Sequence, residues 1–349
     1  MATWARHFAA AFRLFALLAA SALLTPDARA QSPDDKPKAL KVSVAVGPAF
    51  ALGKVAQDWT KRIAERSGSA LTLELHPGAT LAQRDPDREF AALRDGAADL
   101  AVGSTLHWSA QIDELSAVGL PWLAPEPSEL AALATGEVKD RLFAAVERAG
   151  AVPLALAPLD HRAIAARAKI VRVPDDLRGL RIRITPSRFL LDFYAGLGAL
   201  PFSMPFAEAA NQFQAGGLDA QEGPVATFAA ARLDSLGMRS VTLWGAVAEL
   251  AIFAVNRSVW EKWTIEQRAL VRAAAEDAAS ELAASASAEH EAALTTLKSR
   301  DVALLRLTES GRALFAAAAR PTYDKWAVVA GAALVRAAEA AVAAQRTVR

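Results

Sequence analysis

The sequence of 349 residues contains no cysteine. This absence excludes disulfide bonds, thiolate nucleophiles, cysteine-ligated metals and dithiol redox pairs. Histidine is also scarce, with five in the chain, and none of His76, His107, His161 and His290 has a second histidine at the spacing that a helical metal site requires. We therefore expect no metal centre.

Signatures of catalysis are absent as well. The sequence has no nucleophile elbow, no Walker loop, no dinucleotide-binding glycine motif and no zinc-protease motif. Asp160 and His161 are adjacent, but no nucleophile accompanies them, so we interpret them as polar residues of a loop rather than as part of a triad. The formal net charge is +1 and no basic run occurs, which gives no reason to expect nucleic-acid binding. We predict that the protein is not an enzyme and uses no cofactor.

Only the N-terminus carries a run of strongly hydrophobic residues. Arg6 and Arg13 precede an apolar segment of eleven residues, 14–24, and the small residues of Ala28-Arg29-Ala30 follow it. The segment is shorter than the roughly 20 residues that cross a bilayer. The pattern predicts a secretory signal peptide over 1–30, a periplasmic mature protein and, over 31–39, a polar, disordered lead-in.

Strand and helix patterns alternate along the rest of the chain, and they do so in two series. The first series predicts strands at 40–46, 71–75 and 99–103 with helices at 51–66 and 87–95. The second predicts strands at 152–157, 180–184, 249–255 and 301–308, with helices at 187–197, 206–214, 261–298, 309–318 and from Pro321 onward. Two α/β series indicate two lobes around a cleft.

An arginine pair marks the predicted strand 180–184. Arg181 and Arg183 flank Ile182, so the two-residue period of a strand places both guanidinium groups on one face. Ligands of open α/β sheets bind beyond the carboxyl ends of the strands, and Arg183 is nearer that end. A permanently charged, planar guanidinium suits a carboxylate, so Arg183 is the first candidate for ligand binding. Arg181 is expected to be a surface residue.

Polar residues also follow a later strand pattern. Gln221 and Glu222 fall where a strand would end, a position that can supply polar groups to a cleft or form a solvated turn. Phe206 ends a turn-rich linker and begins a predicted helix.

The run from Pro174 to Phe228 resembles the solute receptors of tripartite ATP-independent periplasmic (TRAP) transporters. The motifs that carry the resemblance are the following stretches: Asp176-Leu-Arg-Gly-Leu-Arg-Ile-Arg183, Met204-Pro-Phe-Ala-Glu208 and Leu218-Asp-Ala-Gln-Glu-Gly-Pro224. Weaker similarities at Leu93–Asp99, Leu120–Leu123 and Val255–Trp260 extend it over nearly the whole mature chain.

This resemblance implies a two-lobed periplasmic binding protein of the dicarboxylate-receptor family. Each lobe would have a mixed sheet flanked by helices, and a long helix would span both. The implied boundaries are 40–158 with 249–288 for lobe I, and 159–248 with 289–349 for lobe II. The implied ligand is a small organic acid, and the implied partners are the integral membrane subunits of the transporter.

Site residues follow from the same resemblance. In the family, the arginine that corresponds to Arg183 grips the ligand carboxylate. Arg162 is the nearest match to a second family arginine, Phe206 to a pocket aromatic, and Trp244 is a further lining candidate that could equally belong to the core.

Two features depart from the family pattern. Gly223 replaces an asparagine that usually helps to hold ligand, which removes a polar contact and leaves room, and the tyrosine of a family helix motif is replaced in the stretch 210–214. The loop at Arg84 is also more charged than usual and could reach the cleft. The ligand therefore stays open. The alternatives to a TRAP receptor are an ABC-type periplasmic binding protein, a secreted enzyme on the same scaffold and a ligand-independent interaction protein.

Overall fold

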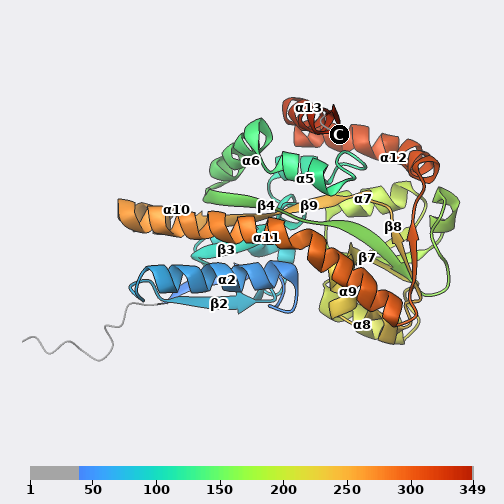
Figure 1. Cartoon of the computed structure of the whole chain (residues 1–349), viewed down its shortest axis with the longest axis horizontal. Helices are drawn as coiled ribbons and strands as arrows, with labels where there is room; N and C mark the ends of the chain where they lie inside the picture. Colours follow the sequence, from blue (N-terminus) through green and yellow to red (C-terminus); the bar gives the residue numbers. More distant parts are fainter. Residues whose placement is uncertain (1–38, 348–349) are drawn as a thin grey trace, which may run out of the picture. The chain divides into compact units, whose positions relative to one another are not determined.

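One strand of 16 residues, β4 (Ala151–Ala166), connects two β-sheets (Figure 1). The computed structural model describes residues 39–347, with Ala207 described by its backbone alone. The predicted signal peptide (1–30) and all but the last residue of the predicted lead-in (31–39) lie outside the described residues. Residues 151–161 of β4 pair with β9 (Ala248–Asn256), and residues 162–166 pair with β7 (Ala220–Pro224), in both cases antiparallel.

The first sheet has the strand order β2-β1-β3-β9-β4. Its parallel strands are β1 (Leu40–Val44), β2 (Leu73–Pro77) and β3 (Leu100–Ser104), whereas β9 runs antiparallel to β3. Every residue of β3 and β9 is buried, which explains their nearly continuous apolar sequences.

The second sheet continues from β4 through β7, β5 and β6. β5 (Arg181–Ile184) runs parallel to β7 and to β6 (Leu200–Ser203). β8 (Ser240–Leu243) pairs with the end of β4 and with β10 (Ala303–Arg306). Both sheets therefore contain parallel and antiparallel pairs, which confirms the predicted mixed sheets.

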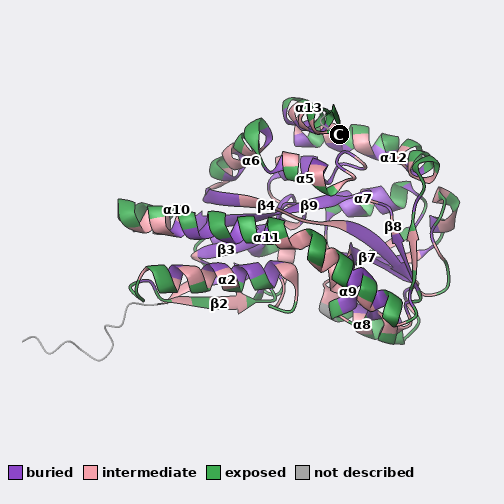
Figure 2. Cartoon of the chain, in the orientation of Figure 1, coloured by how far each residue is buried: buried purple, intermediate pink, exposed green. Residues whose placement is uncertain are grey.

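Helices cover both sheets, and their outward faces are exposed (Figure 2). The α-helices are α2 (Ala51–Arg66), α3 (Glu89–Arg94), α4 (Thr105–Trp108), α5 (Pro127–Leu133), α6 (Gly136–Ala149), α7 (Arg188–Gly196), α8 (Phe206–Gln214), α9 (Val225–Ala230), α10 (Arg257–Lys262), α11 (Ile265–Ser299), α12 (Glu309–Ala330) and α13 (Ala332–Thr347). Five short 3₁₀ helices, η1–η5, lie at Thr80–Ala82, Pro86–Arg88, Asp113–Gly119, Pro174–Leu177 and Leu233–Leu236.

Helix α11, with 35 residues, contributes to two separate hydrophobic clusters. Its first half, from Val271 to Leu282, packs with α2 and the first sheet, and its second half, from Ala293 to Leu297, packs with α8, α9 and β8. Figure 1 shows α11 passing from α2 to α9 across β4. The expected helix that spans both lobes is therefore confirmed.

Three local expectations are wrong. The helix predicted over 261–298 is interrupted, because Thr264 forms a capping box with Gln267 and begins α11 after α10 has ended. Pro321 does not begin a helix but lies inside α12. Asp160 and His161 belong to β4 rather than to a loop. Their part of β4 reads poorly as a strand because Pro153 and Pro158 interrupt it, and the ladder with β9 shifts register beside both prolines.

Within residues 39–347, no single helix has the length and apolarity to cross a membrane. Helices α12 and α13, which are bent by 116° relative to each other, reach this length and apolarity only when they are taken together.

Candidate ligand-binding site

Two adjoining cavities lie at the middle of β4. The smaller, with a volume of about 130 Å³, is lined by the ends of β3, β5 and β7 and by residues of α2, α8 and α11. The larger, of about 370 Å³, is lined by β4, the β8–β9 connection, the start of α5 and the middle of α11. Leu159, Asp160, Arg162, Ala286 and His290 line both, so the two cavities adjoin.

Arg183 lines the smaller cavity and is 4% exposed. Its Nε and Nη2 atoms donate to the Met204 carbonyl oxygen at 3.0 and 2.8 Å, which is the only hydrogen-bond acceptor of this side chain among the described residues. Burial lowers the pKa of Arg183 to about 10, although Glu222 acts in the opposite direction. The guanidinium therefore stays charged at neutral pH, with no carboxylate bonded to it.

Arg162 has the opposite environment. Its Nε and Nη2 atoms donate to the two carboxylate oxygens of Glu222, and its Nη1 atom donates to Glu249 at 2.6 Å. Burial disfavours its charge, but Glu222 and Glu249 together hold the pKa of Arg162 above its ordinary value. The backbone N–H of Thr185 also donates to Glu222, and the Ser104 hydroxyl donates to Glu249. Each of the three guanidinium nitrogens of Arg162 therefore donates to a glutamate.

Aromatic side chains close one side of the smaller cavity. The ring of Phe206 lies 5.7 Å from the Arg183 guanidinium carbon, close enough for a cation–π contact. Phe50, just before α2, meets Phe206 edge-on at 6.1 Å. Because Phe50 adjoins the first sheet and Phe206 the second, this pair joins the two halves of the fold over the cavity.

A second contact joins the two halves inside the cavity. His107 of α4 lies 2.9 Å from the Thr185 hydroxyl through Nε2, whereas its Nδ1 atom is buried and has no partner among the described residues. Burial and the nearby charges of Arg162 and Arg183 lower the pKa of His107 to about 3, so the imidazole is neutral. A neutral imidazole with one free nitrogen can hydrogen-bond a polar ligand atom.

The β7 candidates Gln221, Glu222 and Gly223 also line the smaller cavity. Gln221 and Glu222 are buried, so the alternative of a solvated turn is wrong. The room expected beside Gly223 is limited, because a Cβ atom there would lie 3.2 Å from the ring of Phe228.

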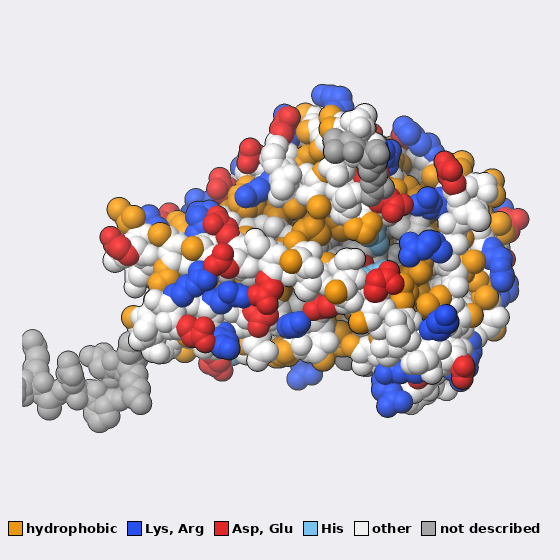
Figure 3. Space-filling model, in the orientation of Figure 1, with side chains coloured by type: hydrophobic (Ala, Val, Ile, Leu, Met, Phe, Trp, Pro, Cys, Tyr) orange, Lys and Arg blue, Asp and Glu red, His pale blue; other side chains and the backbone are white. Residues whose placement is uncertain are grey.

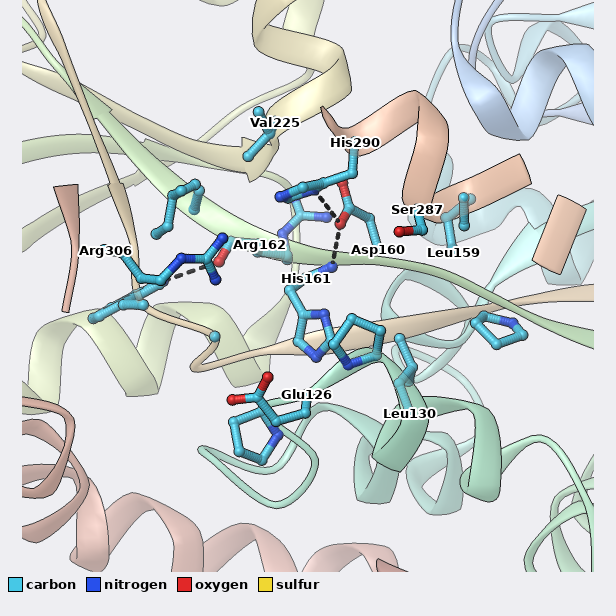
Figure 4. Close-up of a pocket in the computed structure, with 18 of the residues that line it drawn as sticks. Glu126, Leu130, Leu159, Asp160, His161, Arg162, Val225, Ser287, His290 and Arg306 are labelled. Atoms are coloured by element: carbon cyan, nitrogen blue, oxygen red, sulfur yellow. Dashed lines mark hydrogen bonds and ion pairs between the residues drawn. The ribbon is translucent and has the colours of Figure 1, made fainter. Parts of the chain in front are cut away.

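Trp244 is placed elsewhere. It lines the larger cavity, is almost wholly buried among other aromatic rings, and donates its indole N–H to the Arg162 carbonyl oxygen at 3.0 Å. Figure 3 shows histidine side chains at the bottom of a hollow between Arg and Asp or Glu side chains. In Figure 4, His161 and Glu126 lie on one side of β4 in this cavity, and His290 reaches Asp160 from the other.

Two other arginines lie away from the smaller cavity. Arg181 forms a two-bond ion pair with Asp219 and is partly exposed, as expected of a surface residue. Arg84 is exposed on the connection between η1 and η2.

The sequence analysis missed many residues of the smaller cavity, among them the polar residues Ser104, His107, Thr185 and Glu249. Glu249 alone gave a usable signal, because a carboxylate in an otherwise apolar strand requires a buried partner. No group of three or more metal-ligating side chains occurs within residues 39–347.

The fold has two lobes with a cavity between their sheets, and a buried arginine without a carboxylate partner lines this cavity. These features are typical of a solute-binding receptor. The model of the bacterial extracellular solute-binding proteins, family 7, matches residues 42–328, and the chain belongs to this family.

Solved and curated relatives agree. A TRAP periplasmic solute-binding protein of Ralstonia eutropha, solved with bound (S)-2-acetolactate, is 37% identical with a TM-score of 0.86 and covers 88% of this chain and 99% of its own. The C4-dicarboxylate-binding periplasmic protein DctP of Rhodobacter capsulatus is 25% identical over 310 residues, which are 88% of this chain and 92% of that protein. A TRAP protein of Shewanella oneidensis with bound succinate, 20% identical, shares the fold with a TM-score of 0.80 and covers 88% of this chain and 99% of its own.

These relationships confirm the resemblance to TRAP solute receptors. The protein is a solute-binding receptor of the TRAP class, a family of receptors and not of enzymes.

Proposed function

We propose that the smaller cavity binds the carboxylate of a small organic acid through Arg183, and that the receptor delivers the acid to the integral membrane subunits of a TRAP transporter. The observation that carries this proposal is the Arg183 guanidinium, which is buried and charged but bonded only to a carbonyl oxygen. An incoming carboxylate would complete its hydrogen bonding with a charge-assisted pair. The acetolactate bound by the Ralstonia eutropha protein is an acid of this kind.

The other candidates act around this contact. Phe206 packs against the guanidinium, and Gln221 and Gly223 form the wall beside it. Glu222 and Arg162 hold each other in place rather than the ligand. Trp244 supports Arg162 from the larger cavity through its carbonyl group.

Delivery requires access to the cavity and secretion of the chain. Opening would separate Phe50 from Phe206 and His107 from Thr185 by a hinge motion in which β4 and β9 bend. We place lobe I at 40–158 with 249–288 and lobe II at 159–248 with 289–349, although α13 packs on α5 and α6 of lobe I. The signal peptide at 1–30 would direct the receptor to the periplasm.

Arg183→Gln tests the proposal, with Arg181→Gln as the matched control two residues earlier on the same strand. Calorimetric titration with a panel of hydroxy, keto, dicarboxylic and sugar acids identifies a ligand for the wild type. We expect Arg183→Gln to weaken its binding by about 2–5 kcal/mol, because a desolvated charge contact is lost. Arg181→Gln should keep wild-type affinity. Equal affinities of the Arg183 variant and the wild type would refute the role of Arg183.

A further inference from the structure

The ionised side chains that meet around the Arg162–Arg183 pair balance one another. Arg162 and Arg183 provide two positive charges, and Glu222 and Glu249 provide two negative charges. Both glutamates bond to Arg162, so neither forms an ion pair with Arg183. The buried cluster has no net charge before any ligand enters.

The remaining charged groups on the cavity wall have partners of their own. Asp160 lies 3.3 Å from the Nδ1 atom of His290, and Glu289 bonds to Lys54 at 2.9 Å. Among the described residues that line the cavity, Arg183 is thus the one arginine without a carboxylate partner. A ligand with one carboxylate finds a counter-ion in Arg183, whereas a second carboxylate would find Arg162, Lys54 and His290 each already paired with a carboxylate of the protein.

The space beside Arg183 is small. Its volume of about 130 Å³ is well below the roughly 300–1,000 Å³ of cavities that hold drug-sized ligands. Val46, Leu52 and Leu159 provide apolar wall. A short, uncharged carbon chain therefore fits this part of the cavity better than a long or ionised one.

Two buried polar atoms of this wall have no partner within residues 39–347: Oε1 of Gln221 and Nδ1 of His107. A buried polar atom without a hydrogen bond costs free energy, so a ligand group that forms a hydrogen bond with either atom gains affinity. The Gln221 amide oxygen can only accept a hydrogen bond, so it requires a donor from the ligand. A ligand hydroxyl group can donate its proton to this oxygen, while its own oxygen accepts from Nδ1–H of the His107 imidazole.

We infer that the receptor selects short hydroxy-monocarboxylates over dicarboxylates, with Glu222 and Glu249 as the specificity-determining residues and with Gln221 and His107 reading the hydroxyl. This inference rests on the proposed function, because Arg183 must hold the carboxylate. The two glutamates act on specificity by neutralising Arg162, which would otherwise offer a second carboxylate a counter-ion.

Three acids with the same four-carbon skeleton test the inference. Titration calorimetry at pH 7 compares 2-hydroxybutyrate with butyrate, which lacks the hydroxyl, and with malate, in which a carboxylate replaces the terminal methyl group. We expect 2-hydroxybutyrate to bind at least about tenfold more tightly than either of the others, since an unpaired hydrogen-bonding atom or a like charge opposes them.

The variant Glu249→Gln removes one negative charge and retains an acceptor for Arg162. It should bind malate more tightly than the wild type does and reduce the preference for 2-hydroxybutyrate. Glu129→Gln is the control, because Glu129 is equally buried and paired with Arg346, away from the cavity. The control should leave the preference unchanged.

Two kinds of failure are distinguishable. The proposed ligand class is wrong if the wild type binds malate as tightly as 2-hydroxybutyrate, or binds only longer or dicarboxylic acids of the panel. If Arg183→Gln abolishes that binding, the proposed function still stands. If butyrate matches 2-hydroxybutyrate, the reading of the hydroxyl is refuted. If Arg183→Gln binds the wild-type ligand with unchanged affinity, the proposed function itself fails.

Discussion

Replacing Arg162 by methionine would leave Glu222 and Glu249 without the cation that they share. The side chains of the three residues are 6%, 0% and 3% exposed, so water cannot take the place of the guanidinium. Removing one member of a buried ion pair costs about 3–5 kcal/mol, because the remaining charge stays buried and uncompensated. With two glutamates affected, we expect the free energy of unfolding to fall by at least this amount.

Denaturant unfolding followed by tryptophan fluorescence and circular dichroism measures the loss. The triple variant Arg162→Met, Glu222→Gln, Glu249→Gln should recover most of it, since neither carboxylate is left buried without its cation, and Arg181→Met should change stability little, because its pair with Asp219 is partly exposed. A single variant that loses less than about 1 kcal/mol, or a triple variant no more stable than the single one, would refute the account of Arg162 as a structural counter-ion.

Further predictions concern the first sheet and the helices beside it. Glu89 is fully buried, and burial raises its pKa to about 8, against the hydrogen bonds from Ser43 and Trp108. Its proton is therefore held by the folded state and released by the unfolded state between about pH 4.5 and 8, so wild-type stability falls as the pH rises through this range. Glu89→Gln should remove this pH dependence, so that between pH 5 and pH 9 the stability of the variant rises by about 2–4 kcal/mol relative to that of the wild type in denaturant titrations. Parallel plots of stability against pH for the two proteins would contradict this prediction. Gly103→Ala would place a Cβ atom 2.0 Å from the Trp108 ring, so we expect a loss of more than about 2 kcal/mol by the same assay. Gly47→Ala, which also has no positive φ and where nothing lies within 4 Å, should change the free energy of unfolding by less than about 1 kcal/mol.

Much of the fold follows from local sequence patterns. The bounds predicted for α2 and α8 equal those observed, because apolar spacing and terminal glycine or serine residues mark these helices. β4 was predicted over only six of its 16 residues. Its second half is a strand because β9 on one side and β7 on the other both pair with it, and these partners are far away in the sequence.

The end of the chain shows the same limit. Proline is favoured in the first turn of a helix, so Pro321 predicted a helix start. In the structure α12 continues through it, with Phe315, Ala319 and Trp326 packed into the largest hydrophobic cluster on either side of the proline. Burial of these side chains outweighs the loss of one backbone hydrogen bond.

The candidate site was only partly predictable, and the two arginines show why. Both line the smaller cavity from a strand, both are buried, and the sequence assigned a ligand contact to each. Their bonding partners, and hence the roles that we propose for them, differ because of Glu249, which lies 87 residues after Arg162 in the chain and reaches it through the pairing of β9 with β4. Glu222 completes the neutralisation from β7, whereas Arg183, on the other side of β7, meets a carbonyl group. A side chain's chemistry alone therefore does not distinguish a ligand-binding arginine from a structural one; the carboxylates brought to it by the sheet do.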